Sequence, residues 1–113
     1  MSNLIRKEVE VDIKGEEFIM YFDMYSITVY KELTGRNFLS ALDKLFNQDE
    51  EEMIYFIAST LRRKGDNPKP LGKEVLDPKF NILAILFTLR WTVLDIIASG
   101  LPDRENEAQP KKK

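Results

Sequence analysis

The segment from Pro78 to Ala98 limits most strongly what this chain can fold into. Its pattern is that of a helix, yet apolar side chains occur around nearly the whole circumference. A helix that is apolar on every side has to be covered on every side, by a large protein, by a membrane or by partner molecules. A chain of 113 residues has little material for such a cover. We therefore expect part of this helix to contact something other than its own chain.

Length and composition set the other limits. Hydrophobic residues at 43% and charged residues at 32% are typical of one soluble globular domain. We place this domain at 1–101, followed by a disordered polar tail at 102–113 that has no apolar spacing. The formal net charge of −2 argues against nucleic-acid binding, which usually needs a basic face. Without cysteine or a secretory signal, a cytoplasmic protein is expected.

A membrane span is one alternative for the apolar segment. Its length suffices, because a span takes about 20 apolar residues. However, Arg90 and Asp95 lie in its middle half, and each would cost roughly 2.5–3.5 kcal/mol at the centre of a bilayer. They are five residues apart, whereas side chains on one helix meet at spacings of three or four. We therefore expect no contact with a membrane.

The preceding residues predict an α+β fold, in which an N-terminal β-hairpin is followed by a mainly helical bundle of about four helices. Residues 8–13 and 17–22 alternate around the turn signal Lys14-Gly15, which predicts the hairpin. The first helix is expected to begin after Asp23 and to close at Gly35. We place the long apolar C-terminal helix at the centre of the bundle.

Three further helices complete this prediction. A short second helix follows Asn37, and its predicted apolar face consists of Phe38, Leu39, Leu42, Leu45 and Phe46. The third is expected to open at Asp49, with Glu52 closing a capping box, and to end in the basic residues 62–64, which would complement the helix dipole. The fourth starts at Asp77-Pro78 and stops at residues 100–102.

The chain offers few of the groups that catalyse reactions. It contains neither histidine nor cysteine, so its serines and threonines lack a histidine base. Its glycines are scattered and form no phosphate-binding loop. The acidic run 49–52 and the basic run 62–64 fit solvated helix ends better than a cation site or a phosphate site. We therefore expect no enzyme activity, cofactor, metal or small-molecule substrate.

Six residues of the last helix are the candidates for contact with a partner: Phe80, Leu83, Phe87, Arg90, Trp91 and Leu94. Arg90 lies on the apolar side of the helix and has two interpretations. Its guanidinium either reaches solvent past its neighbours or pairs with a carboxylate of another helix or subunit, for example from the acidic run 49–52. Trp91 is either a core residue or an anchor of a partner contact.

The order of these features resembles that of the small tail assembly chaperones of long-tailed phages and prophages of Gram-positive hosts. The resemblance covers residues 5–101 and includes the segments 22–27 and 30–42. Its most distinctive part is the helix end Leu33-Thr34-Gly35 followed by Phe38-Leu39.

The resemblance implies a non-enzymatic protein of the bacterial host cytoplasm. Such chaperones coat the apolar, helical tape-measure protein and keep it soluble until tail-tube subunits polymerise around it. They are absent from the finished particle and associate with themselves into spirals or rings. Many are also made in a second, longer form by a programmed ribosomal frameshift, and Lys111–Lys113 stand where that slip is expected. Lysine codons broken by guanine, with no overlapping downstream reading frame, would exclude the frameshift and leave an ordinary solubilising tail or an expression scar.

Two other functions stay open. The chain can be a small oligomeric structural protein of the tail or of head completion that stays in the virion, or a regulatory module. The presence of the protein in purified virions separates the structural protein from the chaperone. A regulatory module predicts a basic helix that faces DNA, which this sequence lacks.

Overall fold

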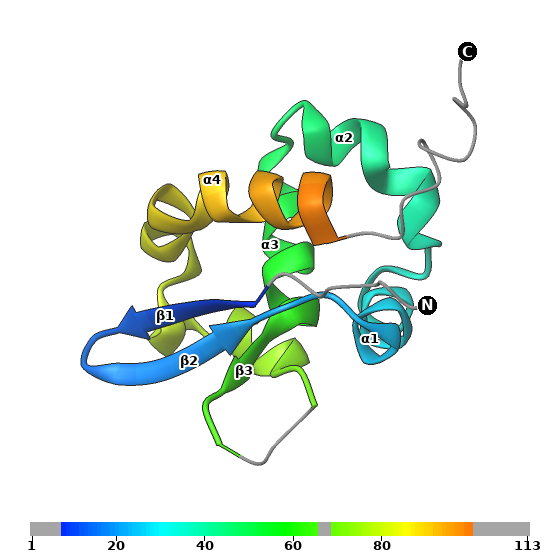
Figure 1. Cartoon of the computed structure of the whole chain (residues 1–113). Helices are drawn as coiled ribbons and strands as arrows, with labels where there is room; N and C mark the ends of the chain where they lie inside the picture. The colour runs from blue at the N-terminus through cyan, green and yellow to red at the C-terminus, as the bar shows by residue number, and fades with distance from the viewer. Residues whose placement is uncertain (1–7, 66–68, 101–113) are drawn as a thin grey trace.

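A three-stranded antiparallel sheet and four α-helices make up the chain in the computed structural model, which describes residues 8–65 and 69–100 (Figure 1). The elements are β1 (Val9–Ile13), β2 (Glu16–Met20), α1 (Met24–Thr34), the 3-10 helix η1 (Phe38–Ala41), α2 (Leu42–Phe46), α3 (Glu50–Thr60), β3 (Leu61–Arg63), the 3-10 helices η2 (Gly72–Leu76) and η3 (Pro78–Phe80), and α4 (Ile82–Gly100). The predicted α+β class is confirmed. The tail predicted at 102–113 and the lysines at its end lie outside the described residues.

β1 and β2 form the predicted hairpin. Val9 pairs with Met20 and Ile13 with Glu16. The two residues between the strands, Lys14 and Gly15, both have positive φ angles, 55° and 83°, which is the requirement of the type I′ turn that matches the twist of a hairpin. The inner side of β2 contributes fully buried apolar side chains to the core.

The third strand contradicts the sequence prediction. The third helix was expected to include residues 62–64, but α3 ends at Thr60 and Leu61 pairs with Met20 of β2. The strand pairing gives partners to backbone groups of β2 that would otherwise be buried without hydrogen bonds. In the extended conformation the chain also directs Arg62 into the interior, where it is 0% exposed.

Arg62 ties three elements together. One terminal nitrogen donates to the carbonyl oxygens of Thr60, at 2.8 Å, and of Tyr21. The other donates to Asp23 Oδ1 at 2.6 Å, and the guanidinium carbon lies 3.7 Å from the centre of the Tyr21 ring. Asp23 is also the predicted cap of α1, since its carboxylate accepts from the Ser26 N–H at 3.2 Å. The buried arginine therefore fixes β3, the end of β2 and the start of α1 relative to one another.

A second buried charge connects α1 to α3. Glu52 is 1% exposed, and its carboxylate accepts from the Tyr30 hydroxyl and from the Arg36 guanidinium. Burial, reinforced by the bond to Glu52, raises the pKa of Tyr30 above its ordinary value. The predicted cap Asp49 is present and accepts from the Glu52 N–H at 3.1 Å. The carboxylate of Glu52, however, binds α1 instead of closing the predicted capping box.

α3, rather than the last helix, occupies the centre of the molecule, so the predicted position of α4 is wrong. α3 contacts α1, α2, α4 and η2, whereas α4 lies along one side of this body (Figure 1). The difference arises because the second half of α3 is buried on all sides, while α4 has one face in the core. α4 also begins later than predicted, because Pro78–Phe80 form η3 and Asn81 takes a left-handed conformation with φ 54°.

Replacing Arg62 by alanine is expected to lower the free energy of unfolding by about 3–5 kcal/mol, because the partly buried Asp23 carboxylate and the buried carbonyl oxygens of Tyr21 and Thr60 all lose this donor. The neighbouring Arg63 pairs with Glu16 and Glu74 at exposed positions, so Arg63→Ala should cost no more than about 1 kcal/mol. Urea unfolding followed by circular dichroism measures both values. Equal losses in the two variants would contradict the role assigned to Arg62.

The contact between Tyr30 and Glu52 predicts a pH dependence. Tyr30→Phe should cost about 1–3 kcal/mol at neutral pH, because the buried Glu52 carboxylate loses a donor. Above pH about 10 the unfolded chain loses the tyrosine proton and the folded chain keeps it, so the stability contributed by Tyr30 falls as pH rises. The stability difference between wild type and Tyr30→Phe should therefore shrink in alkali. Tyr25→Phe, at an exposed residue, is the control for removing a tyrosine. A stability difference between wild type and Tyr30→Phe that stays constant as pH rises would refute the prediction.

Candidate functional site

α4 buries one face and exposes the other. The buried face consists of Ile85, Leu86, Leu89, Val93, Ile96 and Ile97, which belong to the core. These positions recur at spacings of three and four, as expected for one face of a helix. On the other side, Leu83 is 62% exposed, Phe87 78% and Trp91 64%. The chain thus leaves large apolar side chains of its longest helix uncovered.

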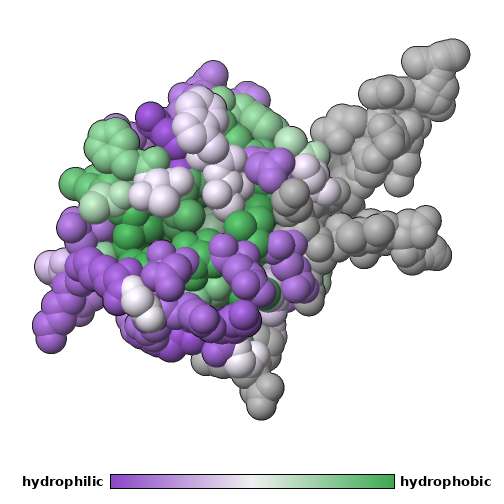
Figure 2. Space-filling model, turned by 60° about the vertical axis from the view of Figure 1, so that its left-hand side comes forward, coloured by the Kyte–Doolittle hydropathy of each residue, from purple (hydrophilic) through white to green (hydrophobic). Residues whose placement is uncertain are grey.

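We call Leu83, Phe87 and Trp91 the apolar ridge. Their spacing of four residues places them in one row along the helix, and the helical rise gives this row a length of about 12 Å. By helical periodicity, Arg90 lies beside one long border of the row, whereas Asp95 follows Trp91 at the same spacing of four and lies at the end of the row. Figure 2 shows an apolar area framed by hydrophilic residues on the side of the molecule that carries the first turns of α4. Contiguous exposed apolar surface of this kind marks interaction sites.

The six predicted contact residues fall into different surroundings. Leu83, Phe87 and Trp91 form the exposed ridge. Phe80 is half-buried, and its ring meets that of Phe18 edge to face, with 5.9 Å between the ring centres. Leu94 is half-buried against the core. Phe80 and Leu94 therefore contribute to the interior of the chain, and the most accessible apolar surface belongs to the other three.

Arg90, the sixth candidate, is half-buried beside the ridge. Its guanidinium carbon lies 5.9 Å from the centre of the Phe87 ring. Its Nε is buried and has no hydrogen-bond acceptor within residues 8–65 and 69–100. The acidic start of α3, which the sequence suggested as a source of a carboxylate, forms no ion pair with Arg90 in the described residues, and the buried Glu52 there binds Arg36 and Tyr30.

Sequence reasoning missed other exposed apolar residues. Leu39 and Phe46 were predicted on the apolar face of one short helix, but both are more than half exposed. In the structure this segment begins as the 3-10 helix η1 and continues as α2. A 3-10 helix has three residues per turn instead of 3.6, so a face assigned from the α-helical period points in the wrong direction. The change of helix type left no clear signal in the sequence.

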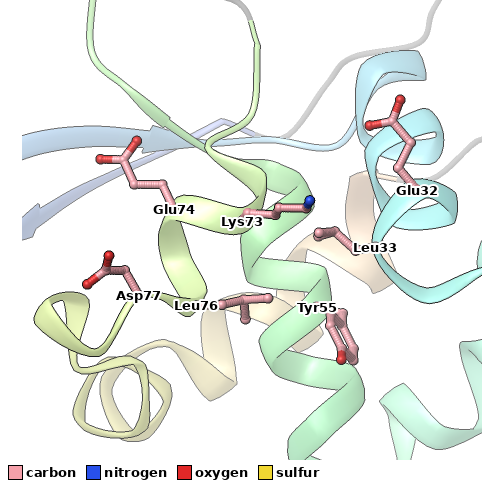
Figure 3. A pocket seen from close by; sticks show the side chains of 7 residues that line it. All are labelled: Glu32, Leu33, Tyr55, Lys73, Glu74, Leu76 and Asp77. Carbon is pink, nitrogen blue, oxygen red and sulfur yellow. The ribbon is translucent and has the colours of Figure 1, made fainter.

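A groove between α1, α3 and η2 is the other candidate site and has a volume of about 500 Å³. Its lining consists of Glu32, Leu33, Tyr55, Lys73, Glu74, Leu76 and Asp77 (Figure 3). Two of the carboxylates have structural partners. Glu74 accepts from Arg63 at 3.0 Å, which holds its pKa below the usual value, and Asp77 caps η3 by accepting from the Lys79 N–H. No side chain of this lining is a nucleophile paired with a base, so the apolar ridge is the stronger candidate.

α4 has the length and apolar character of a membrane span, with a mean hydropathy of 1.8 over Ile82–Ser99. Core helices of soluble proteins share this property but are mostly buried, whereas 33% of this window is buried inside the molecule, in keeping with the exposed ridge. The described residues form a compact globular body in which α4 contacts α3. This is the form of a soluble protein.

Comparisons with protein-family models, with curated proteins and with solved structures found no match for this chain. The ridge itself offers recognition chemistry. Its aliphatic and aromatic side chains supply dispersion contacts and apolar area, and Arg90 supplies one positive charge at its border.

Two leucines of α4 provide a matched test of this arrangement. Leu83→Ala should change the free energy of unfolding by no more than about 0.5 kcal/mol, because the side chain is mostly exposed. Leu89→Ala should cost about 2–5 kcal/mol, because Leu89 is 3% exposed and its truncation leaves a cavity. Denaturant unfolding of the two variants measures the difference. A loss at Leu83 as large as that at Leu89 would show that the ridge is covered in solution.

Proposed function

We propose that this chain is a phage or prophage tail assembly chaperone whose apolar ridge binds the tape-measure protein and keeps it soluble during tail assembly. The sequence resemblance supports the client, and the exposure of Leu83, Phe87 and Trp91 in one row supports the mode of binding. On this proposal the protein acts in the bacterial host cytoplasm, by binding alone, without a cofactor or a catalysed reaction.

The ridge fits a helical apolar client. A row of side chains four residues apart packs into the groove between two rows of a second helix. Phe87 and Trp91 bring large apolar areas, and tryptophan is common among the residues that dominate binding energies. A long helical client with uncovered apolar stripes would otherwise associate with itself. Binding of this chain to each stretch would shield the stripes until tail-tube subunits replace it.

Self-association is part of the same proposal. Uncovered apolar surface favours contact between copies when the client is absent, and the resemblance implies spirals or rings. Sedimentation over a range of concentrations measures this association. The second, frameshifted form implied by the resemblance concerns Lys111–Lys113, outside the described residues, and the coding DNA decides it.

A structural role in the particle is the second candidate, because an exposed apolar ridge also suits a permanent interface. The two roles differ in where the protein ends up. A chaperone should be missing from purified virions, whereas a component of the tail or head should be retained in a fixed ratio to the other structural proteins. Mass spectrometry of purified particles distinguishes them.

Co-expression with the long helical protein encoded downstream tests the chaperone role. We expect that protein in the soluble fraction only when this chain is present. Phe87→Gln should reduce its recovery severalfold, because a polar side chain replaces the most exposed residue of the ridge. Leu39→Gln, at an exposed apolar residue outside α4, is the control and should behave as wild type. Equal solubility of the client without the chain would overturn the function, and full activity of Phe87→Gln would exclude the ridge.

A further inference from the structure

Arg90 indicates what the partner of the ridge has to carry. We propose that the ridge binds an amphipathic helix with a carboxylate beside its apolar stripe, and that this carboxylate pairs with Arg90. The inference rests on the proposed function for the identity of the client. It adds the chemical property by which the ridge would select one apolar helix over another.

The first reason is that Arg90 differs from the other described arginines in having no carboxylate partner. Arg36, Arg62 and Arg63 are each paired with a carboxylate in the structure. Arg90 is the one described arginine without an ion pair, and its buried Nε has no acceptor within the described residues. It also lies beside the ridge, with its guanidinium near the exposed ring of Phe87. A charge left unpaired at the border of an uncovered apolar row is complementary to an acidic partner.

A partner that covers the ridge makes a carboxylate next to Arg90 more necessary. A partner seated on Phe87 would remove water from the neighbouring guanidinium, and a desolvated cation is unfavourable unless it gains a charged or hydrogen-bonding partner. An Asp or Glu at the edge of the partner's stripe would supply a charge-assisted hydrogen bond, and the planar guanidinium suits a carboxylate. A partner that is only apolar would leave Arg90 covered and unpaired.

A helix suits the ridge better than a strand, because the row of side chains matches the grooves of a second helix. A second copy of α4 is a poorer match. In a two-fold antiparallel pair the same borders of the two helices face each other, so the Arg90 borders would meet. Asp95, the acidic residue of α4, continues the row of the ridge at its far end and lies on neither long border. An antiparallel pair would therefore bring like charges together, and a parallel pair would place Arg90 against the opposite border, which consists of Ala84, Thr88 and Thr92 and has no carboxylate.

The chain carries its own probe for the test. Trp91 is the single tryptophan of the sequence and lies on the ridge, so a shift of its emission to shorter wavelength reports coverage of the ridge. The ligands are two synthetic helical peptides of about 20 residues, without tryptophan and with identical apolar stripes. One peptide has Glu beside the stripe, and the other has Gln at that position. Both are titrated into the full chain, into Arg90→Gln and into Lys31→Gln, which removes an exposed positive charge on α1.

We expect the Glu peptide to bind the wild-type chain about tenfold more tightly than the Gln peptide, as for a charge-assisted hydrogen bond. Arg90→Gln should reduce this preference to less than about twofold, and Lys31→Gln should retain it. Added salt should weaken the preference. These comparisons use two peptides on one protein, so they do not depend on how stable a variant is.

Three outcomes would overturn the inference. Equal affinity of the wild-type chain for both peptides would show that Arg90 does not select a carboxylate. No shift of Trp91 with either peptide would show that the ridge does not take a helix. A shift that follows protein concentration and ignores the peptides would assign the ridge to a second copy. Failure of the proposed function is separate: the Glu peptide would bind as expected while the tape-measure protein stayed equally soluble without the chain.

Discussion

The burial of one face of α4 against the rest of the chain is the contact on which the core depends. Its six buried side chains complete an interior that β2, α1 and α3 begin. The same helix has apolar residues on its other face, and the described strands and helices cover only the first face. Coverage therefore stops halfway around α4. Among the described residues, the exposed ridge is the part of α4 that no other element covers.

Two buried charges fix β2, β3, α1 and α3 relative to one another. Arg62 holds the end of β2 next to the start of α1, and Glu52 holds α1 on α3. Burying a charge costs free energy that its partners at best balance, so these contacts add little net stability. They restrict the geometry, because each accepts only one arrangement of donors and acceptors. The apolar side chains supply the stability, and the buried charges select which arrangement they adopt.

The parts of the fold that local chemistry determines could be predicted from the sequence. The hairpin turn and the caps Asp23, Gly35 and Asp49 follow from residues close together in the chain. β3 could not be predicted, because a basic run after an apolar stripe fits a helix end equally well. Only the acceptors around Arg62, which include residues some forty positions earlier, make the extended form favourable. The central place of α3 is likewise a property of the assembled chain.

The candidate site shows the same division. Helical spacing indicated that α4 has more apolar surface than the chain can cover. It did not indicate which side of α4 the chain covers. Phe80 and Leu94 were therefore grouped with residues that are far more exposed. The structure shows which side of α4 is exposed, and Arg90 lies at the border of that side, next to the ridge. An uninterrupted apolar ridge would attract any apolar surface, including aggregating chains. A cation that loses its water whenever the ridge is covered penalises every partner except one with a carboxylate in reach. A single unpaired side chain can thus give a ridge of only three residues a means to discriminate among apolar helices.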